Sequence, residues 1–250
     1  NFQIVNGCQT SNVLFENRGA LGDVMVNIKI VETQLEDVFS ELVRATNSQT
    51  KVEDTQFLSL RPIVRKVEQF FNTYEGAEGR LYLERRDRQY VGQDIPNTRI
   101  FSLHNAAKCV AAMLCNRPEL ASRYPKTMYE ELTETIFADD TKEIVFYAAC
   151  LTMYRFTLLV SNSTIPQNLK RFKWHMLPLV WAILNGKDGV RLNSRMAERG
   201  AQVVIGVMGQ HGARASETFN RIAEMCTGLG EVTADRLKRQ AILQEMLALI

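Results

Sequence analysis

Two short polar stretches near the start of the chain carry side chains suited to binding a charged ligand. The first, residues 6–11 (NGCQTS), follows the apolar run 2–5 and opens a segment with helical character. A strand that ends in a glycine turn and leads into a helix exposes backbone N–H groups, which bind phosphate and other anions. An ordinary strand–turn–helix with a Thr or Ser cap is the alternative, and the local pattern alone favours it. The candidate binding residues are Asn6, Gly7, Gln9 and Thr10.

The second stretch, residues 44–52 (RATNSQTKV), is a run of amide and hydroxyl side chains flanked by two cations. Such side chains suit contacts to phosphate, sugar or a base edge. A polar helix C-terminus with its loop is the alternative. The candidate binding residues here are Arg44, Asn47, Gln49 and Lys51. We expect both stretches to converge on one polar cleft, faced by Asn6, Gln9, Thr10, Asn47 and Gln49.

Two later stretches combine cations with aromatic side chains, as nucleic-acid grooves do. Residues 80–90 (RLYLERRDRQY) supply Arg85 and Arg86 as candidates, although an edge strand with solvated charges would look the same. Residues 170–175 (KRFKWH) open an apolar helix and supply Lys170, Arg171 and Lys173. Cations at a helix N-terminus oppose the macrodipole, which favours an anionic partner. The alternative is a helix with its aromatic side chains in the core and its cations solvated.

No complete catalytic constellation is present in the sequence. The glycine-containing stretch 206–212 lacks the lysine of a phosphate loop and fits a connection between helices better. The three His residues have no metal-ligand spacing, and no GxSxG or HExxH motif occurs. We expect Glu84 and Asp87 to pair with neighbouring arginines rather than hold a metal. We therefore expect no metal and no cofactor, and whether the chain is an enzyme or a nuclease-associated component stays open.

The elements that must position these residues point to an α+β fold. Period-two alternation over 23–31 predicts a strand, helical spacing predicts a helix over 55–73, and 80–91 and 99–103 are two further strand candidates. From residue 104 onward the pattern is helical. The expected helices cover residues 8–17, 104–116, 126–137, 141–160, 168–185, 194–208, 214–227 and 231–249. The chain divides into a small mixed strand–helix part, 1–103, and an all-helical part, 104–250.

Composition limits the possible functions. The 250 residues are 46% hydrophobic and carry a net charge of only +2, so any nucleic-acid site must be a local basic patch. Residues 166–199 form such a patch, with seven basic side chains against two acidic ones. The run 144–160 is too short to span a bilayer and predicts a buried core helix, with no membrane partner. Five cysteines without a CxxC pair indicate reduced thiols in the cytoplasm. The absent initiator Met suggests a fragment that lacks its N-terminal part.

Taken in order, these stretches resemble the AIPR (abortive infection phage resistance) family of prokaryotic defence proteins. The resemblance rests on VNGCQT, VNIKIVET, RATNSQTKV and FLSLRPIVRKVEQFF, and continues through LYLERRDRQY, TRIFSL, ELASRY and KRFKWHMLPL. It covers about residues 1–185. A weaker similarity links residues 6–10 to ParB-like and DndB-like domains, which bind nucleotides or DNA around a DGxHR motif. Asn6 stands here in the Asp place and Thr10 in the Arg place.

The resemblance implies a cytoplasmic anti-phage protein of the abortive-infection type. We expect it to engage nucleic acid, DNA or RNA, through the polar N-terminal cleft and the basic helical segment, alongside other defence-system subunits. Two alternatives belong to other classes. One is a nucleotide or phosphate sensor at residues 6–11. The other is a protein-interaction module whose basic segment docks an acidic partner.

Overall fold

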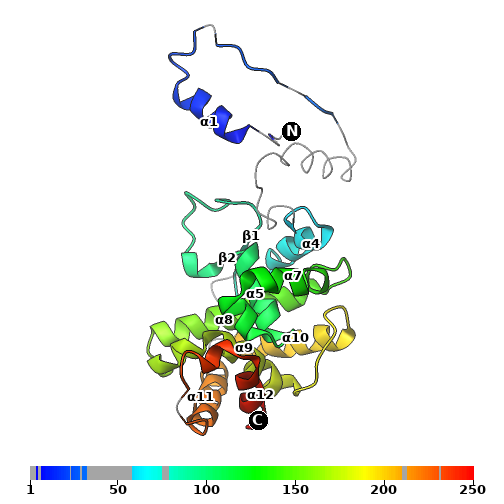
Figure 1. Cartoon of the computed structure of the whole chain (residues 1–250), viewed down its shortest axis with the longest axis vertical. Coiled ribbons are helices and arrows are strands. Elements are labelled where there is room, and N and C mark those ends of the chain that lie inside the picture. The colour runs from blue at the N-terminus through cyan, green and yellow to red at the C-terminus, as the bar shows by residue number, and fades with distance from the viewer. Residues whose placement is uncertain are drawn as a thin grey trace. The chain divides into compact units, whose positions relative to one another are not determined.

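The computed structural model describes Ile4 and residues 7–22, 24–28, 30–32, 58–74, 79–209, 213–230 and 232–250. The chain forms two compact units, Asn1–Leu60 and Arg61–Ile250. A mostly helical α+β structure confirms the predicted fold class (Figure 1). The predicted functional division between residues 103 and 104 stays a prediction.

The first unit contains the helix α1 (Cys8–Glu16), which confirms the predicted helix over 8–17. The strand predicted over 23–31 is wrong, because residues 24–28 and 30–32 have no regular structure. Met25 and Ile30 are almost completely exposed there. An alternating sequence becomes a strand only when a neighbouring strand accepts its backbone hydrogen bonds, and the described part of this unit offers none. Residues 33–57, including the start of the helix expected over 55–73, lie outside the described residues.

The second unit contains a small parallel sheet. Strand β1 (Tyr82–Glu84) pairs with β2 (Ile100–Ser102), and Glu84 stands opposite Ser102. The two strands confirm the predicted pair but are shorter than expected, because the chain leaves β1 after Glu84 and turns. Parallel strands require a long crossover. Residues 85–99, which include the 3-10 turn η1 (Asn97–Arg99), supply it and lead from the carboxyl end of β1 back to the amino end of β2.

Helices form the remainder of the second unit. They are α4 (Pro62–Phe71), α5 (Leu103–Met113), α6 (Pro118–Arg123), α7 (Pro125–Ile136), α8 (Glu143–Ser161), α9 (Lys173–Asn185), α10 (Arg195–Met208), α11 (Ala213–Thr227) and α12 (Gln240–Ala248), with 3-10 turns η2 (Gln167–Phe172) and η3 (Arg236–Lys238). The predicted connection between helices at 206–212 is confirmed, since α10 ends at Met208 and α11 begins at Ala213. Helix α6 has no counterpart among the expected helices.

Prolines set the beginnings of three helices. Pro62, Pro118 and Pro125 each occupy the first turn, where a missing N–H is tolerated. Proline also disfavours helical backbone in the residue before it. Arg61 is accordingly extended, with φ −62° and ψ 140°. Helix α4 therefore starts at Pro62, after a turn at residues 59–61, and the predicted start at 55 lies outside the described residues.

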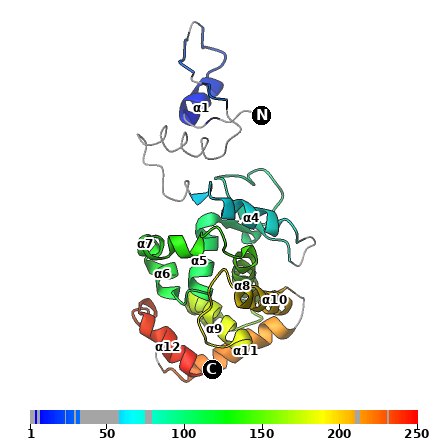
Figure 2. The same ribbon diagram turned by 90° about the vertical axis from the view of Figure 1, so that its right-hand side faces the viewer.

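Helix α8 is the centre of the core. It packs against α4, α5, α9 and α10 (Figure 2). Its side chains are buried on nearly all sides. By length and composition it could cross a membrane, but 78% of its apolar window is buried inside the structure. This burial agrees with the predicted core helix. Its one cation, Arg155, donates from Nε to the carbonyl oxygen of Met208, 2.8 Å away.

Tyr147 of α8 holds the sheet on the helices. Its hydroxyl donates to the carbonyl oxygen of Gly79, three residues before β1. Its ring stacks on Tyr74 with centroids 4.0 Å apart and meets Phe71 of α4 edge-on at 5.3 Å. These contacts tie α4, α8 and the approach to β1 together, and thereby fix where the strand begins.

Candidate nucleic-acid interface

The predicted basic stretch 170–175 lies where η2 runs directly into α9. Leu169 and Phe172 are buried and anchor the segment, while Lys170 and Arg171 between them are exposed. Lys173 is the first residue of α9. The segment therefore places its apolar side chains inside and its cations on the surface, at the positive end of a thirteen-residue helix.

Trp174 is the centre of this group of cations. Its indole ring is half-exposed, and the Lys173 Nζ lies 5.2 Å from the ring centre. The Nζ of Lys108, from α5, lies 4.7 Å from the same ring. Cation–π attraction holds an ammonium group over an aromatic ring, and tryptophan is the strongest partner. We call Lys108, Lys173 and Trp174 the lysine–tryptophan cluster.

The lysine charges of the lysine–tryptophan cluster lack a compensating negative charge. Partial burial lowers the pKa of Lys108, and the nearby positive charge of Lys173 lowers it further. Lys108, Lys170 and Lys173 have no ion-pair partner among the residues that the structure describes. The N-terminus of α9 adds further positive potential. An anion bound here would relieve repulsion that the fold itself leaves uncompensated.

Lys108 is a site residue that the sequence did not single out. It lies 65 residues before Lys173, and only the packing of α5 on α9 brings the two lysines to one ring. One signal was present in the chain. Lys108 is a lone cation in the middle of LHNAAKCVAAM, a helix whose other central positions are small or apolar.

Arg171 has a different role from the lysines. Its Nη1 donates to the carbonyl oxygen of Val232, 3.1 Å away, and its guanidinium lies over Phe172 at 4.7 Å. It therefore ties η2 to the segment before η3. Part of its donor capacity is already used inside the fold.

The second basic stretch is built around Glu68 of α4. Arg85 donates from Nε to Glu68 at 2.7 Å, and Gln89 donates to the same carboxylate at 2.8 Å. Both side chains of the ion pair are largely buried, so Arg85 is a structural residue. The expectation that Glu84 and Asp87 pair with neighbouring arginines is wrong, because neither has an ion pair in the described structure. Arg86 is exposed.

The N-terminal motif is described only in part. Gly7 is the N-cap residue of α1 and has φ 88°, a left-handed backbone conformation that glycine adopts without steric strain. Ser11 donates its hydroxyl to the Gly7 carbonyl at 3.1 Å, so it serves the helix, while Gln9 and Thr10 are exposed. Asn6 and the residues Arg44, Asn47, Gln49 and Lys51 lie outside the described residues. Their convergence with residues 7–11 stays a prediction.

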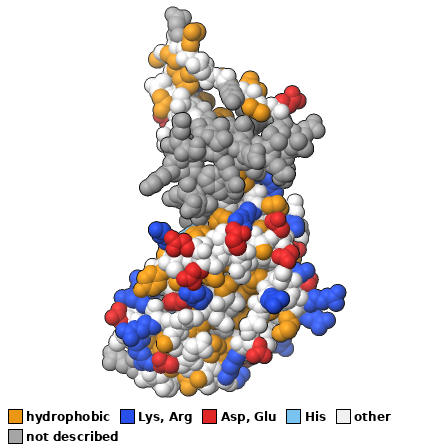
Figure 3. Space-filling view, turned by 45° about the vertical axis from the view of Figure 1, so that its right-hand side comes forward, with side chains coloured by type: hydrophobic (Ala, Val, Ile, Leu, Met, Phe, Trp, Pro, Cys, Tyr) orange, Lys and Arg blue, Asp and Glu red, His pale blue; other side chains and the backbone are white. Residues whose placement is uncertain are grey.

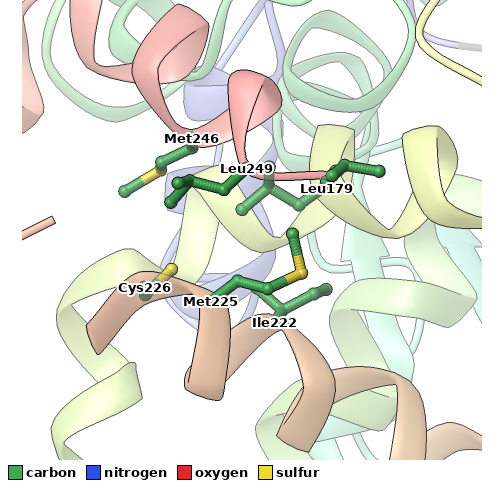
Figure 4. Close-up of a pocket in the computed structure, with 7 residues that line it drawn as sticks. Leu179, Ile222, Met225, Cys226, Met246 and Leu249 are labelled. Carbon is green, nitrogen blue, oxygen red and sulfur yellow. The ribbon is translucent and has the colours of Figure 1, made fainter. Parts of the chain in front are cut away.

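Two further features of the described residues provide neither a metal site nor a ligand pocket. No three His, Cys, Asp or Glu side chains there are placed to hold a metal ion. An apolar gap between α9, α11 and α12, lined by Leu179, Met225 and Met246, has no room for a water molecule (Figure 4). It belongs to the packing of the helices.

Charge on the visible face of the second unit is mixed. Lys and Arg side chains alternate there with Asp and Glu, so neither sign covers the whole face (Figure 3). This pattern agrees with the small net charge. A basic site on this protein is therefore a local cluster.

The comparison with protein families gives one match. The family model described as AIPR protein matches residues 1–225, well past residue 185, the expected end of the resemblance. No curated protein and no solved structure matches the chain.

Proposed function

The chain belongs to the AIPR family, which gives it a role related to phage resistance, and on that premise we propose that it acts by engaging nucleic acid. The proposed interface is the lysine–tryptophan cluster with the exposed Lys170 beside it. The predicted polar stretches at residues 6–11 and 44–51 are proposed as a second contact.

One observation carries this proposal. Two ammonium groups from different helices lie within 4.7 and 5.2 Å of one indole centre, and no described carboxylate pairs with either. A surface lysine normally gains stability from nearby acids or from full hydration. Here partial burial and the nearby charge of Lys173 act against the charge of Lys108, whose pKa is lowered. A phosphate group provides the missing negative charge, and nucleic acids present phosphates at regular spacing.

The experiment is a salt titration of oligonucleotide binding. Single-stranded DNA, single-stranded RNA and duplex DNA would be compared by fluorescence anisotropy, with Lys108→Met and Lys173→Met as test variants. If each lysine contacts one phosphate, the slope of log affinity against log salt falls by about 0.7–0.9 per variant. Methionine keeps most of the apolar stem, so packing on Trp174 is retained.

Lys126→Met is the matched control. Lys126 is an exposed lysine of α7 that already pairs with Glu130 at 3.7 Å. Its loss should leave the slope unchanged. Binding that does not depend on salt, or that responds equally to all three variants, would contradict the proposal. If an acidic peptide then competed for the cluster, the protein-docking alternative would replace it.

A further inference from the structure

A cleft of about 370 Å³ lies at the edge of the sheet where both strands end. Glu84 and Ser102, the last residues of β1 and β2, lie opposite each other on its wall. Asn105 in the first turn of α5 also lines it, because α5 begins directly after β2. In open α/β sheets, ligands bind outside the carboxyl ends of the parallel strands. The cleft has the same position relative to β1 and β2.

Three polar side chains in this cleft have no partner in the described structure. They are the Glu84 carboxylate and the amides of Asn97 and Asn105. The other polar groups of the lining are used by the fold. Tyr90 donates its hydroxyl to the Leu83 carbonyl at 3.2 Å, and the Ser102 hydroxyl accepts from the Asn105 backbone N–H at 3.2 Å.

Glu84 is the most informative of the three. It is half-buried, and a carboxylate in that environment is stabilised by N–H donors. Among the described residues no cation lines the cleft, so an anionic group has no counter-charge there. The lining therefore favours a neutral ligand with donors for Glu84, acceptors for the two amides and apolar faces for Ile95 and Ile100.

We propose that this cleft binds a guanine base. Guanine presents N1–H and N2–H side by side, which a carboxylate accepts together, and its O6 next to them accepts from an asparagine amide. Cytosine and adenine offer one amino group on that edge, and uracil and thymine offer one ring N–H flanked by carbonyl oxygens that Glu84 would repel. The volume is in the range of small-ligand pockets and accommodates a nucleoside.

The position of α5 connects this cleft to the lysine–tryptophan cluster. Asn105 and Lys108 are three residues apart on one helix, so they are neighbours on the same face, about 4.5 Å apart along the axis. A nucleotide with its base against Glu84 would carry its phosphate toward Lys108. The phosphate contact rests on the proposed function, whereas base recognition by Glu84 does not.

The experiment uses the full chain and twelve-residue oligo(dT) strands with a single central dG, dA, dC or dT. The strand with dG should bind about tenfold more tightly than the dT strand. In Glu84→Gln the preference should fall to within about twofold, while the salt slope stays unchanged. Lys108→Met should do the reverse, lowering the slope and keeping the preference. Because Glu84 has no partner in the described structure, its variant should unfold at the wild-type temperature.

Asp94→Asn is the matched control, since Asp94 is an exposed carboxylate in the same crossover and does not line the cleft. It should keep the dG preference. Equal binding of the four strands, or a preference that survives Glu84→Gln, would overturn the proposal. GMP, but not AMP, CMP or UMP, should raise the unfolding temperature of the wild type, and Glu84→Gln should abolish this effect. That result would support base binding in the cleft even if the lysine variants left oligonucleotide binding unchanged.

Discussion

The Nζ atom of Lys108 on α5 lies 4.7 Å from the ring centre of Trp174 on α9, so one indole ring fixes the position of a cation from another helix. Replacing the ring should therefore weaken anion binding without removing a charge. We expect Trp174→Leu to lower oligonucleotide affinity about fivefold, since two cation–π contacts of modest strength are lost. The slope against log salt should stay at its wild-type value. A slope reduced by a full phosphate contact would mean that the ring does more than position the lysines.

His175 should make stability depend on pH. Its side chain is 2% exposed, its Nε2 has no hydrogen-bond partner in the described structure, and burial lowers its pKa to about 4. Above pH 6.5 the ring is neutral in both folded and unfolded chains. Between pH 6.5 and 4 only the unfolded chain takes up the proton, so the free energy of unfolding falls as pH falls, by up to about 3 kcal/mol.

Urea denaturation at pH 7 and at pH 4.5 measures this effect. His175→Leu removes the titrating group, and the difference in unfolding free energy between the two pH values should shrink accordingly. The same difference in wild type and variant would assign the pH dependence to other groups.

Two glycines of α10 should respond oppositely to alanine. A Cβ on Gly200 would lie 2.5 Å from Cη2 and 2.9 Å from Cζ2 of Trp181, so Gly200→Ala forces α9 and α10 apart. We expect a loss of about 2 kcal/mol in unfolding free energy. A Cβ on Gly206 would meet no neighbouring atom within 4 Å, and Gly206→Ala should stabilise the helix by about 0.5–1 kcal/mol. Equal effects in chemical denaturation would contradict the close approach of the two helices.

Tyr147→Phe should loosen the start of β1. The variant keeps the ring contacts with Tyr74 and Phe71 but leaves the Gly79 carbonyl without its donor. We expect about 1–2 kcal/mol of destabilisation. The exposed Tyr124 provides a matched control, and Tyr124→Phe should leave the unfolding midpoint unchanged. Hydrogen exchange would show whether the loss is concentrated around residues 79–84.

The chain alone should show no metal-dependent nuclease activity. Metal-assisted phosphodiester cleavage needs several ligands around one ion, and the described residues contain no such group. Incubation with DNA and RNA in Mg²⁺ or Mn²⁺ tests this directly. Cleavage that disappeared in Glu84→Ala or Asp87→Ala would identify those carboxylates as a metal site.

Most helices other than α6 were predictable from this sequence because each buries an apolar stripe or, in α8, most of its surface. Their buried apolar residues therefore follow the helical period, whichever element packs against them. Strands were less predictable, because pairing partners are set by distant segments. The alternation over 23–31 meets no partner among the described residues, and β1 stops at Glu84 although basic and aromatic side chains continue to Tyr90.

The candidate site was predictable in part. Lys170 and Lys173 stand out by charge at a helix start, and both are on the surface as expected. Lys108 and the Glu84 cleft were not found, because they depend on which helix packs beside α9 and on where two short strands end together. The only local signal was the lone cation Lys108 in an otherwise small or apolar helix, and it does not say which ring that lysine meets.

The extensive burial of α8 has a consequence for how the protein is made. The helix is finished at Ser161, but α10, one of the elements that cover it, is complete only at Met208. At translation rates of about 5–20 residues per second, the intervening segment takes several seconds to emerge. During that interval α4 and α5 are already made, but the face of α8 that α10 covers is exposed at the ribosome. Slower translation would lengthen this interval, so synthesis conditions and chaperone supply should decide how much chain folds and how much aggregates.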